Sequence, residues 1–116
     1  MRSKSPHAAL SDIKRNIELA YAFVRDCGFD EFQADERTVY AVARCLEIIS
    51  EASRRLPAEL KSRHPQIPWR DMAGLGSVYR HDYEGVRNDV MWRTVQHSLA
   101  PLLVVVEEEL GQPGEA

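Results

Sequence analysis

The stretch DERTVYAVARCLEIISEASRRLP, residues 35–57, decides the expected fold. Apolar residues recur along it every three or four positions, which is typical of a helix with a buried face. One stripe consists of Val39, Val42, Ala43, Leu46 and Ile49, and a second consists of Ala41, Cys45, Ile48 and Ala52. Asp35 is a suitable N-cap, and Pro57 ends the pattern. A helix that is apolar on two sides indicates a central position in the fold, or burial against a partner subunit.

The segment before this helix predicts another helix and a short connection. Residues 8–27 carry apolar side chains at spacings of three and four, and Gly28 follows them as a stop signal. The sequence FDEFQAD, residues 29–35, is predicted to form a short turn or helix, with Phe29 and Phe32 packed into the core.

The segment after the central helix contains more helix breakers. Residues 56–69 hold three prolines and predict a loop, and a short helix is expected to begin at Pro68 and to run to residue 79. A final helix is expected from about Asn88 to residue 110, kinked or restarted at Pro101, with Ser98 as the candidate cap of the restart. No segment alternates like a strand, so the sequence predicts one all-α domain over residues 1–116, a bundle of four or five helices with an ordered core of about residues 8–110.

Composition limits the classes of function. The formal net charge of −3 argues against a protein that coats DNA or RNA by its overall charge. With 116 residues, 44% of them hydrophobic, the core is modest, so we expect a shallow cleft or a shared interface rather than a deep private active site. Cys27 and Cys45 lack the spacing of a metal or redox motif and are expected to be buried free thiols in a reducing compartment. Neither a signal peptide nor a membrane-spanning stretch is evident, so we expect a cytoplasmic protein without a membrane partner.

Four polar side chains lie in a row in the sequence SVYRHDY, residues 77–83. A histidine can take and return a proton near neutral pH, an arginine can neutralise charge on a phosphate, and a tyrosine hydroxyl can be modified. Arg80, His81, Asp82 and Tyr83 together would suit the cleavage of a phosphodiester. The alternative is a polar turn, in which Asp82 caps a backbone group and Tyr83 packs on Trp92.

Two carboxylates, Glu47 and Glu51, lie one turn apart on the central helix. Such a pair can carry out acid–base chemistry, bind a metal or orient a loop residue across the interior. Arg54 and Arg55 follow Glu51 at helical spacing, so surface ion pairs are the simpler interpretation. The histidines lack ligand spacing, and the sequence has no phosphate-binding glycine loop and no zinc signature, so we expect no metal and no cofactor.

Three spaced motifs extend the interpretation. Residues 46–52 read LEIISEA, residues 64–75 read HPQIPWRDMAGL and residues 81–92 read HDYEGVRNDVMW. In this order they resemble the HepT-like family of the HEPN superfamily, over about residues 8–110. The first looks like the family's Glu-Ile-Ile-Gly-Glu-Ala helix signature, with Ser50 in place of the usual glycine. The second is similar to its Pro-x-Ile-Pro-Trp stretch, and the third to its His-x-Tyr followed by a valine and a tryptophan.

The resemblance implies an antiparallel, HEPN-like helical bundle that forms a homodimer, with a metal-independent ribonuclease site at the dimer interface. His81 would act as acid–base at the ribose 2′-hydroxyl of an RNA substrate, and an arginine would stabilise the charge that grows on the phosphate oxygens. Glu47, Glu51 and Asp82 would support this site. The family's partner, a minimal nucleotidyltransferase that acts as antitoxin, would silence the toxin by transferring adenylyl groups to Tyr83.

The chain departs from the family at the motif arginine. The family has an arginine, then four to six residues, then the histidine, and the positions that fit here hold Gly74, Leu75 and Gly76. Removing such a preorganised charge typically lowers the rate by about 10² to 10³. The candidate replacements are Arg80, which directly precedes His81, then Arg70, Arg87 and an arginine from the second subunit.

Three functions stay open at this point. The first is a HepT-like toxin of a toxin–antitoxin pair, an endoribonuclease with His81 as its acid–base and Tyr83 as its modification site. The second is a catalytically degenerate HEPN subunit that binds and regulates a nucleotidyltransferase or senses a nucleotide or RNA, and Gly76 favours it. The third is a helical dimerisation protein without a connection to RNA. A nucleotidyltransferase encoded by the neighbouring gene would support the first two.

Overall fold

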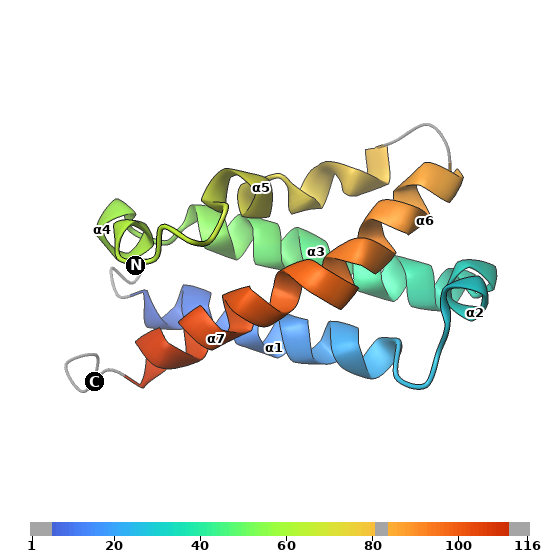
Figure 1. The fold of residues 1–116 in the computed structure, drawn as a ribbon, viewed down its shortest axis with the longest axis horizontal. Coiled ribbons are helices and arrows are strands. Elements are labelled where there is room, and N and C mark those ends of the chain that lie inside the picture. The colour runs from blue at the N-terminus through green and yellow to red at the C-terminus, as the bar shows by residue number, and fades with distance from the viewer. Residues whose placement is uncertain (1–5, 81–83, 112–116) are drawn as a thin grey trace.

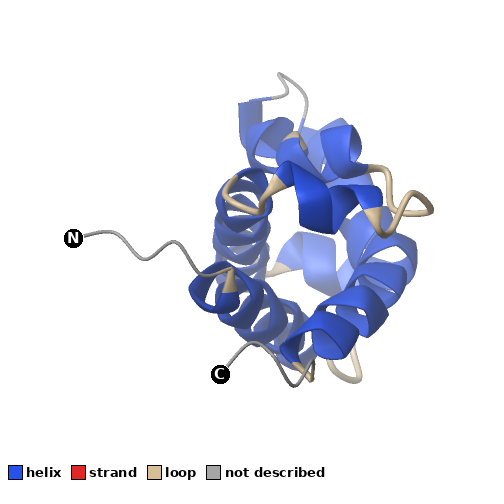
Figure 2. Ribbon diagram, turned by 90° about the vertical axis from the view of Figure 1, so that its left-hand side faces the viewer, coloured by secondary structure: helices blue, strands red, loops and turns tan. Residues whose placement is uncertain are grey.

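The computed structural model describes residues 6–80 and 84–111, and within them the side chains of residues 6–77 and 87–111. Its longer helices are α1 (His7–Phe23), α3 (Glu36–Arg54), α6 (Glu84–Arg93) and α7 (Leu99–Leu110). Its shorter elements are α2 (Phe29–Ala34), α4 (Ala58–Ser62), α5 (Trp69–Ala73), the 3-10 helix η1 (Leu75–Arg80) and the π-helical turn η2 (Thr94–Ser98). These residues form no strand (Figure 2), which confirms the all-α prediction, and none of the described helices is long and apolar enough to span a membrane.

Helix α3 lies at the centre of the bundle, with α1 on one side and α5 and η1 on the other (Figure 1). Both predicted apolar stripes supply buried side chains, namely Val39, Val42, Leu46 and Ile49 from the first and Cys45 and Ala52 from the second. Burying one large aliphatic side chain contributes about 1.5–3 kcal/mol, so this helix is a main source of the stability of the fold. The prediction of a central helix is therefore confirmed.

The start of α3 is capped as the sequence predicts. The Asp35 carboxylate accepts hydrogen bonds from the backbone N–H of Arg37 at 3.1 Å and from the Thr38 hydroxyl at 2.8 Å. The hydrogen bond from the Thr38 side chain is the main reason why the pKa of Asp35 lies below its ordinary value.

The end of the first helix differs from its prediction. Helix α1 ends at Phe23, four residues before the expected end. Asp26, rather than Gly28, adopts the left-handed conformation in the following turn, with φ of 61°. Aspartate tolerates this conformation because its short polar side chain can bond locally, so the turn does not require a glycine. Gly28 instead precedes α2, where its N–H donates to the Glu31 carboxylate at 2.8 Å.

The last predicted helix begins earlier than expected and contains a π turn. Helix α6 begins at Glu84 rather than near Asn88, and η2 separates it from α7. In a regular helix the ring of Pro101 would clash with the carbonyl of the residue four positions earlier, His97. That residue lies in η2, whose wider π-helical turn makes room for the ring. The predicted interruption is confirmed, whereas the prediction for Ser98 is wrong, because its side chain makes no capping hydrogen bond.

The two cysteines differ in burial. Cys45 on α3 is buried, and burial raises the pKa of its thiol to about 11. Cys27 was expected to be buried as well but is only half-buried, because it lies in the turn after α1 rather than on a helix face. Both are free thiols, as expected.

The two tryptophans attach peripheral segments to the bundle. Trp92 of α6 packs on Phe32 and Phe29 of α2, with ring centroids 5.4 and 6.0 Å apart. The indole N–H of Trp69 donates to the carbonyl oxygens of Lys61 and His64, at 3.1 and 3.0 Å, and thereby closes the loop before α5. Both aromatic residues therefore have structural roles, and the expected packing of Phe29 and Phe32 is confirmed.

An ion cluster around a buried carboxylate joins this loop to the last helix. The Glu109 carboxylate of α7 is 4% exposed, and it accepts from the Arg63 guanidinium at 2.9 Å and lies 2.6 Å from Nε2 of His64. The hydrogen bond from Arg63 is the main reason why the pKa of Glu109 lies below its ordinary value.

Candidate functional site

The predicted catalytic loop lies between two described elements. Helix η1 ends at Arg80 and α6 begins at Glu84, so the three residues His81, Asp82 and Tyr83 connect them. These three residues lie outside the described part of the chain, and the side chain of Arg80 does too. Their assigned roles therefore stay predictions.

Gly76, one of the three positions at which the resemblance leads us to expect an arginine, packs directly on the central helix. A Cβ atom at residue 76 would lie 3.2 Å from Oγ and 3.3 Å from Cβ of Ser50, closer than ordinary van der Waals contact. The nearest atom after these is the Cα of Glu47, at 3.6 Å. The two departures from the family motifs, Ser50 and Gly76, thus face one another across the junction of α3 and η1.

Hydrogen bonds hold Ser50 in place at this junction. Its hydroxyl donates to the carbonyl oxygen of Ala73, and the side chain is fully buried. Arg54 donates from Nη1 to that carbonyl at 2.7 Å and to Oγ of Ser50 at 3.2 Å. Because its partners are on two elements, Ser50 has little freedom to move away from a larger residue at position 76.

The two carboxylates of α3 have different surroundings. Glu47 is partly exposed and accepts a hydrogen bond from Arg44 at 2.9 Å, whereas Glu51 is exposed. The prediction that Glu51 forms surface ion pairs with Arg54 and Arg55 is wrong. Arg54 binds the carbonyl oxygen of Ala73, and Arg55 binds Asp12 of α1 at 3.0 Å, because both arginines reach polar groups on neighbouring elements.

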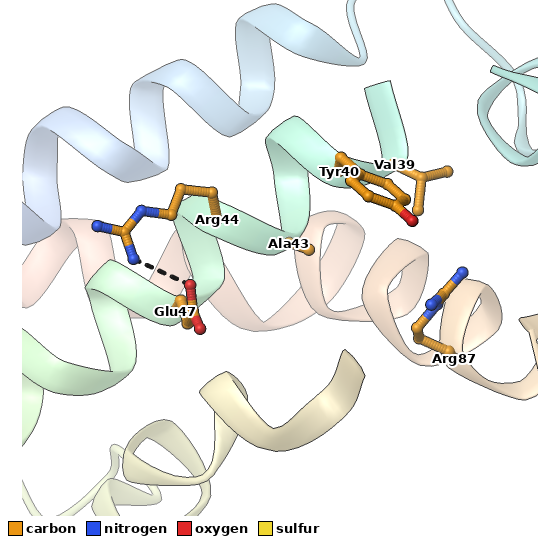
Figure 3. A pocket seen from close by; sticks show the side chains of 6 residues that line it. All are labelled: Val39, Tyr40, Ala43, Arg44, Glu47 and Arg87. Atoms are coloured by element: carbon orange, nitrogen blue, oxygen red, sulfur yellow. Dashed lines mark hydrogen bonds and ion pairs between the residues drawn. The ribbon is translucent and has the colours of Figure 1, made fainter. Parts of the chain in front are cut away.

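A groove lies between α3 and α6. We call it the Tyr40 groove; its volume is about 250 Å³, and it is lined by Val39, Tyr40, Ala43, Arg44, Glu47 and Arg87. Figure 3 shows Arg87 extending from α6 toward the face of α3 that carries Tyr40. Tyr40 is 67% exposed, an unusual state for so large an aromatic side chain.

A second hollow, of about 390 Å³, adjoins this groove and shares Val39, Tyr40 and Arg87 with it. Its remaining lining consists of Ala34 and of three polar residues, Gln33, Glu36 and Asn88. The two hollows thus lie next to one another, with Tyr40 and Arg87 lining both.

The sequence indicated some of these lining residues. Glu47 was a candidate supporting residue and Arg87 a candidate replacement for the motif arginine, and the structure brings both to the Tyr40 groove. The other candidate arginine, Arg70, is exposed on α5 and does not line this groove. The sequence patterns did not identify Tyr40 or Arg44. A signal for Tyr40 was present, because this large aromatic residue lies outside both apolar stripes of the helix and therefore has no place in the core.

The described residues hold no group of three or more histidine, cysteine, aspartate or glutamate side chains that could bind a metal ion. What the Tyr40 groove offers is a flat aromatic ring beside the guanidinium of Arg87, whereas the guanidinium of Arg44 is turned toward Glu47 (Figure 3). Such a combination can bind an anion next to a planar group.

The comparisons with known proteins agree on one family. Residues 13–109 match the model of the HepT-like family, described as ribonuclease HepT-like. A Thermococcus cleftensis protein named "Probable ribonuclease HepT" is 44% identical over 80% of this chain and 84% of its own length. A Methanocaldococcus jannaschii protein named a "putative RNase" is 36% identical over 93% of this chain and 89% of its own length. A protein of Caldanaerobacter subterraneus with the same kind of name is 33% identical over 92% of this chain and 96% of its own.

No solved structure matches the chain. The family model extends over most of the domain, from α1 to α7, and the three relatives cover from 80% to 93% of the chain. The protein therefore belongs to the HepT-like ribonuclease family.

Proposed function

We propose that this protein is the toxin of a HepT-like toxin–antitoxin pair, a metal-independent endoribonuclease whose site forms at a homodimer interface. The observation that carries the proposal is the family match over residues 13–109, which includes the His81-x-Tyr83 motif. The relatives are named as ribonucleases, which supports RNA as the substrate class.

The proposed reaction uses His81 as acid–base. The imidazole takes the proton of a ribose 2′-hydroxyl, the 2′-oxygen forms a bond to the neighbouring phosphorus, and the bond from phosphorus to the 5′-oxygen breaks. A proton is returned to the leaving 5′-oxygen, so that the products are a 2′,3′-cyclic phosphate and a free 5′-hydroxyl. A cation beside the phosphate stabilises the charge that develops on its oxygens.

Regulation is proposed to occur at Tyr83. A minimal nucleotidyltransferase antitoxin would transfer an adenylyl group to the phenol oxygen, with release of pyrophosphate from a nucleoside triphosphate. The attached nucleotide is bulky and anionic, so it would occupy the space that RNA needs and repel the phosphates of RNA.

A second function is favoured by one specific observation, the absence of the motif arginine. Gly76 stands at that position and packs against Ser50, so an arginine there does not fit the present packing without a change at residue 50. A protein without this cation would act as a binding and regulatory subunit of the nucleotidyltransferase.

The test compares three proteins on a mixed pool of RNA in the presence of EDTA. They are the parent, His81→Ala and the double variant Ser50→Gly/Gly76→Arg, which restores the family's arginine together with the smaller residue opposite it. Cleavage by the parent that is lost in His81→Ala supports the ribonuclease. Cleavage by the double variant alone supports the regulatory subunit, and cleavage that persists in His81→Ala contradicts the proposed role of His81.

A further inference from the structure

We propose that the Tyr40 groove binds a nucleotide of single-stranded RNA, with a base stacked on Tyr40 and a phosphate held by Arg87 and Arg44. The proposal rests on the proposed ribonuclease function and specifies where its substrate binds. It assigns a role to residues outside the His-x-Tyr motif.

The charges of the groove suit a phosphate. Two arginines and one glutamate line it, so its lining carries one net positive charge, although the whole chain carries −3. Arg44 is 70% exposed in its side chain and is oriented by Glu47 at 2.9 Å. Arg87 reaches the groove from α6, and its Nε lies 3.5 Å from Oδ1 of Asn88. A phosphate in the groove would therefore meet Arg87 from α6, and Arg44 of α3 would reach it by turning away from Glu47 (Figure 3).

Tyr40 provides the surface for a base. Tyr40 is 67% exposed, whereas Val39 and Val42 on the same stretch of α3 are 4% and 0% exposed. Stacking on an aromatic side chain is the main way in which proteins hold unpaired bases, because every base has an apolar face. Single-stranded RNA presents such faces, whereas the bases of a duplex are already stacked on one another.

The adjoining hollow gives the base edge polar partners. Gln33, Glu36 and Asn88 line it on the far side of Tyr40 from Arg44 and Glu47. The amides of Gln33 and Asn88 both donate and accept hydrogen bonds, and the Glu36 carboxylate accepts them. Base edges and ribose hydroxyl groups require such partners. A phosphate in the first hollow and a base near the second would together occupy both hollows.

The position of Arg87 connects this site to the proposed reaction. It is the fourth residue of α6, and the first residue of that helix directly follows Tyr83. At a rise of about 1.5 Å per residue, Arg87 lies only about one helical turn beyond the end of the catalytic loop. An RNA strand bound in the groove would therefore lead toward this loop.

The test measures binding of a short single-stranded RNA with 2′-O-methyl groups, which cannot be cleaved through a 2′-hydroxyl. Fluorescence anisotropy gives the affinity of the parent, Arg87→Ala, Tyr40→Ala and Tyr40→Phe at several salt concentrations. Arg15→Ala and Phe23→Ala are matched controls, because both residues are exposed on α1 and do not line the groove. Sedimentation of each variant reports its oligomeric state, and cleavage of unmodified RNA is measured in parallel.

We expect Arg87→Ala to weaken binding about tenfold and to reduce the slope of log affinity against log salt by about 0.7, the value for one phosphate contact on a single strand. Tyr40→Ala is expected to weaken binding at least about fivefold, while Tyr40→Phe stays within about twofold because it keeps the ring. Both controls should bind as the parent does.

Three results would overturn the inference. If the parent cleaves RNA and both alanine variants bind as the parent does, the groove is not the substrate site, while the proposed function stands. If the parent neither binds nor cleaves RNA, the proposed function and the inference fail together. If Tyr40→Ala weakens binding only because it dissociates an oligomer, the groove is a contact between subunits.

Discussion

The contact between Gly76 and Ser50 predicts that substitutions at these two positions are strongly coupled. In the parent, Gly76→Ala places a Cβ atom 3.2 Å from Oγ and 3.3 Å from Cβ of Ser50, so the serine must move by a few tenths of an ångström. Ser50 is fully buried and bonded to Ala73 and Arg54, which opposes this movement. In a Ser50→Gly background both close contacts are absent.

The expected magnitude follows from two opposing effects. Overpacking a rigid site typically costs about 1–3 kcal/mol, whereas replacing a glycine by alanine stabilises a protein by about 0.4–1 kcal/mol through the unfolded chain. The second effect applies because no described glycine has a positive φ, so alanine at position 76 is not strained by its backbone. We expect Gly76→Ala to lower the free energy of unfolding by about 1 kcal/mol in the parent, and to raise it by about 0.5 kcal/mol in Ser50→Gly.

The assay is a double-mutant cycle. Urea denaturation gives the free energy of unfolding of four proteins: the parent, the two single variants and the double variant. All are measured at one protein concentration, because association of subunits would make stability depend on concentration. A coupling energy of about 1–2 kcal/mol is expected for residues in direct contact. Additivity within about 0.3 kcal/mol would refute the reasoning, because it would mean that the two positions do not compete for the same space.

Three further predictions concern the stability and reactivity of the fold. Glu109→Gln should lower the free energy of unfolding by about 2 kcal/mol in a urea titration, because Arg63 and His64 lose a buried carboxylate. The control, Glu18→Gln on the exposed surface of α1, should change this free energy by less than about 0.5 kcal/mol. The pKa of Glu109 is lowered in the folded state, so the ionised carboxylate stabilises the fold fully above its ordinary pKa of 4.5 and less as the pH falls below that value. The difference in free energy of unfolding between the parent and Glu109→Gln should therefore shrink in titrations at lower pH. In the native protein, a thiol reagent should label Cys27 well before Cys45, because Cys45 is buried and its pKa is raised to about 11. Labelling is followed by mass spectrometry, and equal rates for the two thiols would contradict the burial of Cys45.

The sequence predicts most of the fold because its signals are local. The period of the apolar residues along 35–57 identifies α3 as central, Asp35 identifies its start, and Pro101 identifies an interruption in the last helix. Each of these depends on residues within about one or two turns of helix, where steric and hydrogen-bonding preferences act directly. The turn after α1 was misplaced because aspartate and glycine can both adopt the left-handed conformation.

The surroundings of the candidate site could not be predicted in the same way, because they depend on contacts between distant parts of the chain. The hydroxyl of Ser50 meets a carbonyl 23 residues later, and His64 meets Glu109 across 45 residues. The exposure of Tyr40 could be anticipated from its place outside the apolar stripes, but its position opposite Arg87 depends on how α6 packs beside α3. Neither propensity nor spacing specifies that packing.

The missing arginine has a physical explanation that is separate from loss of activity. Where α3 and η1 approach as closely as they do at residues 50 and 76, a side chain at one position crowds a side chain at the other, and this chain has its side chain at residue 50, with hydrogen bonds to Ala73 and Arg54. Gly76 is therefore a consequence of packing at the junction, and it does not determine whether a cation reaches the phosphate from another element. Arg87 is in a position to supply one, because it lies one turn into α6 beside an exposed aromatic ring. Activity of the parent that depends on Arg87 would mean that the positive charge lost at η1 is provided from α6.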